Sequence, residues 1–141
     1  MSIDDCLVDL HNYLKLDRKL HPEKKFYVTA IVLDKKGNII ATGSNSFLKT
    51  HPMQYHFAKL CGNENQIFLH AEIAALIKCR KEPYTLLVGR ILRNGQLANA
   101  NPCPICRMAM KETGVFQTIY SNPNGTWTRD FINHSVNERY A

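Results

Sequence analysis

Residues 70–92 decide the fold, and they read HAEIAALIKCRKEPYTLLVGRIL. From His70 to Lys81 the stretch is rich in alanine, leucine and isoleucine and ends in cations, which suit the negative end of a helix dipole. Residues 71–77 leave almost no polar side, so we expect a helix that is buried on most of its circumference. Tyr84 to Leu92 then predicts a strand, and its apolar run Leu86-Leu87-Val88 favours a central position in a sheet.

The chain before this stretch predicts a helix, a β-hairpin and a second, shorter helix. Ser2 followed by two acids is typical of a helix start, and His21-Pro22 breaks the helical pattern. Two β-rich segments, 26–33 and 39–42, flank a turn and are expected to pair antiparallel. Residues 51–61 predict the short helix. Its apolar residues that fall roughly in line are Met53, Phe57 and Leu60.

The chain after this stretch predicts one more helix and a closing hairpin. Residues 103–113 are helical in pattern and stop at Gly114, and residues 115–120 predict a fourth strand. The turn signal at 122–125 lets residues 126–128 return as an antiparallel fifth strand. The sequence also permits a terminal helix over about 130–139.

Helices that alternate with the later strands imply crossovers packed on a sheet. We therefore expect an α/β fold with three layers, α/β/α, in which helices flank a five-stranded mixed sheet. The 141 residues suit one compact domain that spans 1–141.

Composition narrows the class of protein. The longest apolar stretches are far shorter than the roughly 20 residues that cross a bilayer, and the acidic start lacks the features of a secretory signal. Five cysteines, an odd number, argue against a disulfide framework and favour metal or thiol chemistry. We expect a cytoplasmic protein without a membrane partner. Its net charge of +6 would attract phosphates, whether on a nucleotide or on a nucleic acid.

Two short motifs carry the chemistry: His70-Ala71-Glu72 and Pro102-Cys103-Pro104-Ile105-Cys106. Two cysteines three residues apart at a helix start can direct both sulfurs to one ion, and the amides and dipole there favour thiolates. His70 offers a third ligand from the start of another helix. Catalytic zinc sites keep three protein ligands and leave the fourth position to water. We therefore expect Zn²⁺ at His70, Cys103 and Cys106.

Glu72 is what makes this site catalytic rather than structural. It lies two residues after His70, where its carboxylate can approach the open position and move protons without binding the metal. A purely structural site would need a fourth ligand, for which His51, His56 and Cys79 are candidates. A thioredoxin-like redox site would leave His70 and Glu72 unexplained. The two motifs together match the H-x-E…P-C-x-x-C signature of zinc deaminases.

With these motifs, the sequence resembles the cytidine and deoxycytidylate deaminase superfamily, and most of all its small bacterial and phage-type members. The resemblance runs from the strand at residue 26 to the strand at residue 127. It implies a cytidine deaminase-like fold, metal ligands at His70, Cys103 and Cys106, and general acid/base catalysis by Glu72. Asn45 aligns with an asparagine that contacts sugar or base in relatives, and a backbone carbonyl near Asn101 corresponds to one that holds the exocyclic amine.

Two departures bear on the substrate. Free-cytidine deaminases usually carry a glutamate where this chain has Phe47, and deoxycytidylate deaminases often have Ser-Pro where it has Asn101-Pro102. The expected reaction is hydrolytic deamination of cytosine in a free nucleoside or nucleotide, with release of ammonia. The alternatives are a deaminase of cytosine in single-stranded DNA or RNA, a guanine or adenosine deaminase, and a zinc-stabilised binding module without catalysis.

Other residues could also meet a substrate. His51 and His56, with Lys49 nearby, could contact a phosphate, or they could simply pack a short helix. Tyr120 and Trp127 could stack on a base, or they could belong to the core. The resemblance also implies a homo-oligomer.

Overall fold

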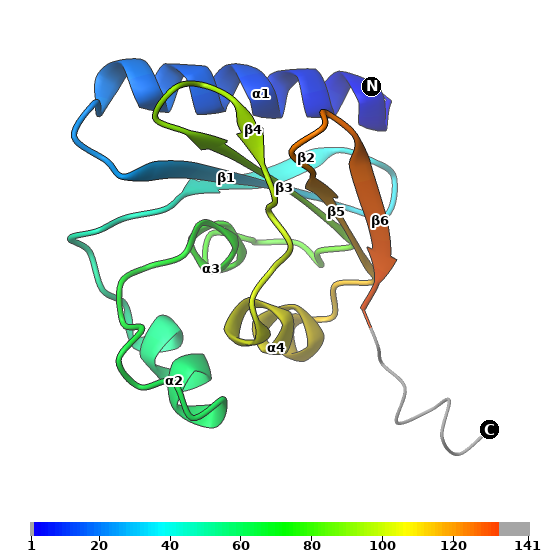
Figure 1. The fold of residues 1–141 in the computed structure, drawn as a ribbon. Helices are drawn as coiled ribbons and strands as arrows, with labels where there is room; N and C mark the ends of the chain where they lie inside the picture. The colour runs from blue at the N-terminus through cyan, green and yellow to red at the C-terminus, as the bar shows by residue number, and fades with distance from the viewer. Residues whose placement is uncertain (1, 133–141) are drawn as a thin grey trace.

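A computed structural model of the chain describes residues 2–132, and it has an α/β fold with one mixed sheet between helices (Figure 1). None of the helices within this range is both long and apolar enough to cross a membrane. The elements in chain order are α1 (Ile3–Leu20), β1 (Phe26–Leu33), β2 (Ile39–Ser44), α2 (Pro52–Leu60), α3 (Ala71–Leu76), β3 (Thr85–Leu92), β4 (Leu97–Ala98), α4 (Pro104–Thr113), β5 (Gln117–Ser121) and β6 (Trp127–Phe131).

The described sheet has six strands, so the expectation of five was wrong. Five strands lie in the order β2-β1-β3-β5-β6, and the additional strand β4 pairs with β3. Strands β3 and β5 are parallel, and the other pairs are antiparallel, including the closing β5–β6 hairpin that the turn at 122–125 predicted. Strand β4 has only two residues, Leu97 and Ala98, which pair with Ile91 and Arg90. A segment this short has no periodicity that could reveal it.

Strand β3 holds the centre, as its apolar run predicted, and it separates two packed layers. Leu86 and Val88 point to the face that α2, α3 and α4 cover, whereas Leu87 points to the face that α1 covers. Successive side chains of a strand point to opposite faces, so a strand that is apolar throughout must be covered on both. Figure 1 shows α1 alone on one face and the other three helices on the opposite face.

Helix α1 begins as the sequence predicted. The Ser2 hydroxyl accepts a hydrogen bond from the Asp5 amide, and the Asp5 carboxylate accepts one from the Ser2 amide, which makes a reciprocal cap. Leu10 and Leu14 are fully buried on the sheet beneath. They pack at Gly89 of β3, where a β-carbon would lie 3.0 Å from the Leu14 side chain.

The end of helix α3 was predicted less well than its start. Helix α3 ends at Leu76 rather than continuing to Lys81, and the next amides, of Lys78 and Cys79, bond to carbonyls three residues back. Pro83 lies shortly after this tightened turn. The sequence permitted a terminal helix over about 130–139, but residues 130 and 131 belong to strand β6. Residues 133–139 of that helix lie outside the described residues 2–132.

Helix α2 buries a different face from the one that its apolar residues indicated. Phe57 is buried, but Met53 is 37% exposed and Leu60 is 55% exposed. The fully buried position one turn before Phe57 is Gln54. A polar residue holds this position because it has hydrogen bonds to make there, toward the loop that leads into α3.

Candidate metal and catalytic site

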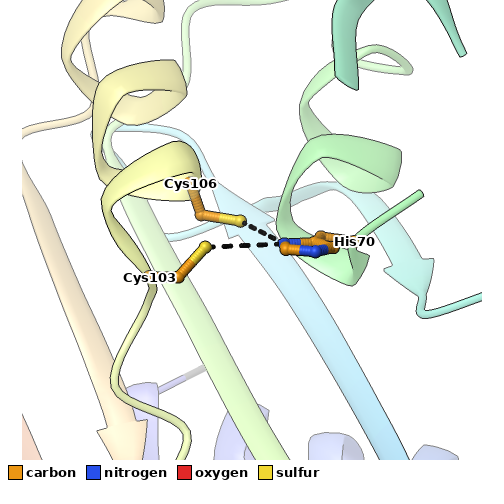
Figure 2. A group of neighbouring side chains, drawn as sticks. All are labelled: His70, Cys103 and Cys106. Atoms are coloured by element: carbon orange, nitrogen blue, oxygen red, sulfur yellow. Dashed lines mark hydrogen bonds between the residues drawn. The ribbon is translucent and has the colours of Figure 1, made fainter. Parts of the chain in front are cut away.

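The site forms where two helices begin. His70 is the N-cap of α3 and Cys103 is the N-cap of α4, and both have extended backbone conformations. Neither side chain makes the usual capping hydrogen bond to its own helix, so each is available to another partner. Cys106 lies in the first turn of α4 and is fully buried. The helix amino ends therefore bring three potential ligands together, as Figure 2 shows.

The three side chains converge closely enough to hold one ion. His70 Nδ1 lies 3.3 Å from Cys106 Sγ and 3.6 Å from Cys103 Sγ. With Zn–N near 2.1 Å and Zn–S near 2.3 Å, a tetrahedral site would separate such atoms by roughly 3.6 Å. One imidazole nitrogen and two sulfurs are also a donor set that zinc favours. The residues present fit Zn²⁺.

The side chains of His70, Cys103 and Cys106 shift one another's pKa values even without a metal. The pKa of Cys103 falls to about 4, chiefly because the Cys106 side chain donates a hydrogen bond to it and also because of His70. Burial raises the pKa of Cys106 well above its usual value. Burial also acts to lower the pKa of His70, but the hydrogen bond and charge of Cys103 outweigh it and raise that pKa. A metal bound here would thus meet one thiolate already formed and displace a proton from the second cysteine.

Gln54 holds the segment that enters the site, and no sequence pattern indicated this role. Its Oε1 accepts a hydrogen bond of 3.0 Å from the His70 amide, and its Nε2 donates one of 3.1 Å to the Gln66 carbonyl. The side chain is fully buried, so both bonds are made away from water. Gln54 thereby fixes the backbone of His70 relative to α2.

Glu72 lies in the first turn of α3, and only 6% of it is exposed. Burial raises the pKa of its carboxyl, because the charged form loses hydration there. A higher pKa moves a carboxyl toward the range in which it can both accept and return a proton near neutrality. The structure thus places a buried carboxyl beside the three residues that fit zinc, on the same helix start as His70.

A cavity of about 460 Å³ opens at this site, a volume within the range of pockets that enclose small molecules. His70, Glu72 and Cys103 line it together with three strand residues, Phe26, Val28 and Arg90. The loops at 45–47, 65–69 and 99–101 complete the wall. The ligand and carboxyl groups therefore face a space that a base and sugar could enter.

Asn45 and Asn101 both line the cavity, and each side chain also has partners in the protein. Asn45 Oδ1 accepts from the Val28 amide at 3.0 Å, and its Nδ2 donates to the Phe26 carbonyl at 3.2 Å. These bonds tie the end of β2 to β1. Asn101 Oδ1 accepts from Arg107 Nη2 at 2.7 Å. Both residues thus have a structural role, and their contact with substrate stays a prediction.

The other candidates from the sequence lie elsewhere. The His51 ring accepts from the Met53 amide and caps α2, while the His56 ring packs edge-on against Phe57. Over residues 2–132 the only His, Cys, Asp or Glu cluster that could hold a metal is that of His70, Cys103 and Cys106. That part of the chain therefore offers three ligands and no fourth, which suits an open coordination position. Tyr120 and Trp127 pack against the core clusters on opposite faces of the sheet.

Comparisons with known proteins identify the family of the chain. Among curated proteins, none matches the chain. Similar solved structures include the cytidine deaminase from Mycobacterium tuberculosis and a mutant of it, each 20% identical with a TM-score of 0.46, over 79% of this chain and 76% or 77% of theirs. The family model described as the cytidine and deoxycytidylate deaminase zinc-binding region matches residues 8–122. This match covers most of the chain, and it includes the three zinc-fitting residues and Glu72. The chain therefore belongs to the cytidine and deoxycytidylate deaminase family.

Proposed function

We propose that this chain, as one domain, catalyses the zinc-dependent hydrolytic deamination of cytosine in a free nucleoside or nucleotide. The single observation that carries the proposal is the buried Glu72 carboxyl on the cavity wall beside His70, Cys103 and Cys106. A structural metal site has no use for such a carboxyl, whose burial without a cation partner is costly. A hydrolase needs one to move protons.

In the proposed mechanism, zinc held by His70, Cys103 and Cys106 would lower the pKa of a bound water to about 7. Glu72 accepts a proton from the attacking water and delivers it to the ring nitrogen next to the amine-bearing carbon. The new carbon–oxygen bond forms as the ring nitrogen is protonated. Glu72 then passes the second proton of the water to the departing amine, which leaves as ammonia. Water and cytosine thus give uracil and ammonia, and the carboxylate is regenerated.

The cavity walls support a planar, partly apolar substrate. Phe26 and Val28 offer apolar surface on one side, and Ala71 and Ala100 are further lining residues. We propose that the remaining donor capacity of the Asn45 amide meets the sugar or base, and that the backbone near Asn101 accepts a hydrogen bond from the exocyclic amine.

A second candidate function is deamination of cytosine in single-stranded nucleic acid, and a neighbouring groove favours it. This groove of about 950 Å³ shares Asn45, Phe47 and Phe68 with the cavity at Glu72, so the two lie side by side. It is lined by more lysines than acids: Lys24, Lys25, Lys49 and Lys78 against Asp17 and Glu23. A basic groove with aromatic side chains is the kind of surface that follows a single strand.

The test is a substrate panel for the zinc-loaded protein. Cytidine, deoxycytidine, CMP, dCMP, guanine, adenosine and a cytosine-containing oligonucleotide are each incubated with it, and ammonia release is followed. We expect turnover of the free cytosine compounds and none after zinc is removed by a chelator. Zinc-loaded, folded protein that leaves every free cytosine compound unchanged would contradict the proposal. Uracil formed only in the oligonucleotide would favour the second candidate.

A further inference from the structure

Arg90 enters the same cavity from the central strand. It lies on β3, two residues after Val88, and therefore points to the same face of the sheet, toward α3 and α4. In register it stands opposite Val28 of β1, and both residues line the cavity. The wall that holds Glu72 and Cys103 thus also holds a guanidinium group.

An aromatic ring fixes the guanidinium in place. The central carbon of the Arg90 guanidinium lies 4.4 Å from the centroid of the Phe26 ring. Phe26 is in turn held edge-on by Phe47, with 5.1 Å between the ring centroids. Stacking on a ring face limits the orientations of the guanidinium plane, so its N–H donors lie in a defined direction.

The charge of Arg90 has no partner in the described chain. Within residues 2–132 its side chain takes part in no ion pair and no hydrogen bond, and its buried Nε lacks any acceptor. Two basic residues outside the cavity have ion-pair partners: Lys24 pairs with Asp17 at 3.0 Å, and Arg107 pairs with Asp130 at 2.8 Å. Among the residues that the structure describes, the one acid on the cavity wall is Glu72, which the proposed reaction uses.

A partly buried, unpaired guanidinium is costly, and an anion that enters the cavity removes that cost. A neutral nucleoside offers oxygen acceptors but no charge. A phosphate offers both, and its oxygens match the planar donors of arginine. We propose that Arg90 binds the phosphate of the substrate and selects nucleotides over nucleosides. This inference rests on the proposed function and names its substrate class.

The test compares nucleotide with nucleoside in two independent measurements. The first is kcat/KM for dCMP and deoxycytidine. The second is calorimetric binding of the products dUMP and deoxyuridine to the zinc-loaded protein, which requires no turnover. The variants are Arg90→Ala and Arg90→Gln, where the second keeps more of the packing on Phe26 if the first fails to fold. The matched control is Arg93→Ala, which removes an equal charge three residues later at an exposed position outside the cavity.

We expect the parent protein to favour dCMP and dUMP over the nucleosides. Both Arg90 variants should lower kcat/KM for dCMP and the affinity for dUMP by about 10- to 100-fold, which is the range of a hydrogen bond to a charged group. In these variants kcat/KM for deoxycytidine and the affinity for deoxyuridine should stay within a few-fold of the parent. The Arg93→Ala control should change neither the nucleotide nor the nucleoside measurements. Equal losses for nucleotide and nucleoside, or a nucleotide preference that survives in the Arg90 variants, would overturn the inference.

The two proposals can fail separately. Binding of dUMP that depends on Arg90, without turnover of any cytosine compound, would support the phosphate site and contradict the deaminase proposal. Turnover of cytosine compounds in which the preference for nucleotide over nucleoside is absent, or does not depend on Arg90, would support the deaminase proposal and contradict the phosphate site.

Discussion

Gln54 and Asn45 are buried amides that hold the surroundings of the site. Gln54 bonds to the backbone of His70, and Asn45 bonds to the backbone of Phe26 and Val28. In each side chain, both the amide oxygen and the amide nitrogen make hydrogen bonds to protein groups instead of to water. Removing such a side chain leaves buried backbone groups without a partner, which costs more than the hydrogen bond itself contributed.

Replacing Gln54 with alanine should therefore affect both folding and metal binding. We expect a loss of about 1–3 kcal/mol in the free energy of unfolding, because the His70 amide loses its acceptor. Zinc affinity should fall by about 10- to 100-fold, as is typical when a ligand loses its outer support. Denaturant unfolding and competition with a zinc chelator measure the two effects. Gln66→Ala is the control, since only the backbone carbonyl of that exposed residue takes part; an equal effect of both substitutions would contradict this role.

At the same scale, the sequence identified the residues with distinctive chemistry and missed those with ordinary chemistry. His70, Glu72, Cys103 and Cys106 could be predicted to share one site, because both motifs stand at helix starts with the spacing that a metal needs. Arg90 could not be assigned to the cavity, because an arginine in a strand is usually solvent-exposed. Its role depends on the registers of β1 and β3, which no local pattern specifies.

Among the elements, β2 and α3 determine where the ligands lie. Gly43 of β2 lies directly on the α3 backbone, where a β-carbon would stand 2.5 Å from the Ala75 nitrogen and 2.7 Å from the Ala71 oxygen. Both atoms are main-chain atoms and cannot turn aside. Helix α3 carries His70 at its cap and Glu72 in its first turn, so this close approach sets the depth of the site.

Gly43→Ala should therefore push α3 away from the sheet. We expect a loss of about 3 kcal/mol in the free energy of unfolding, at the upper end of the usual cost of overpacking, together with weaker zinc binding. Gly89→Ala is the comparison, because its β-carbon would meet the flexible ends of Leu10 and Leu14 on the opposite face. It should cost less stability and leave zinc affinity unchanged. Zinc binding that is as tight in Gly43→Ala as in the parent would contradict this account.

Elements were predictable where local pattern and tertiary packing agree. Strand β1 was predicted with its observed bounds because its composition and both flanking turns point the same way. Helix α4 ends where Gly114 adopts a left-handed conformation with φ 87°, as a glycine after a helix suggests. Helix α3 was predicted too long, since alanine-rich sequence favours helix beyond Leu76 whereas the chain must turn toward β3.

For the molecule as a whole, zinc should act as a clamp between α3 and α4. The three residues that fit zinc, His70, Cys103 and Cys106, lie at the starts of two helices that are far apart in the sequence. A ligand that binds the folded state alone stabilises it by RT ln(1 + [L]/Kd), about 2.7 kcal/mol when free zinc is 100 times Kd. Thermal unfolding with and without a chelator measures this. The melting temperature should rise steadily with free zinc; a temperature independent of zinc would contradict the clamp.

Catalysis by Glu72 at a zinc site is tested by ammonia release from zinc-loaded parent protein and from a zinc-loaded Glu72→Gln variant, with cytosine nucleosides and nucleotides as substrates. Glutamine keeps the size of the buried side chain but cannot accept and return a proton. We predict that the variant retains one zinc per chain and its fold, while kcat falls by about 10²- to 10⁴-fold. A Glu72→Gln variant as active as its parent, or a parent protein that releases no ammonia from any of these substrates, would contradict the account.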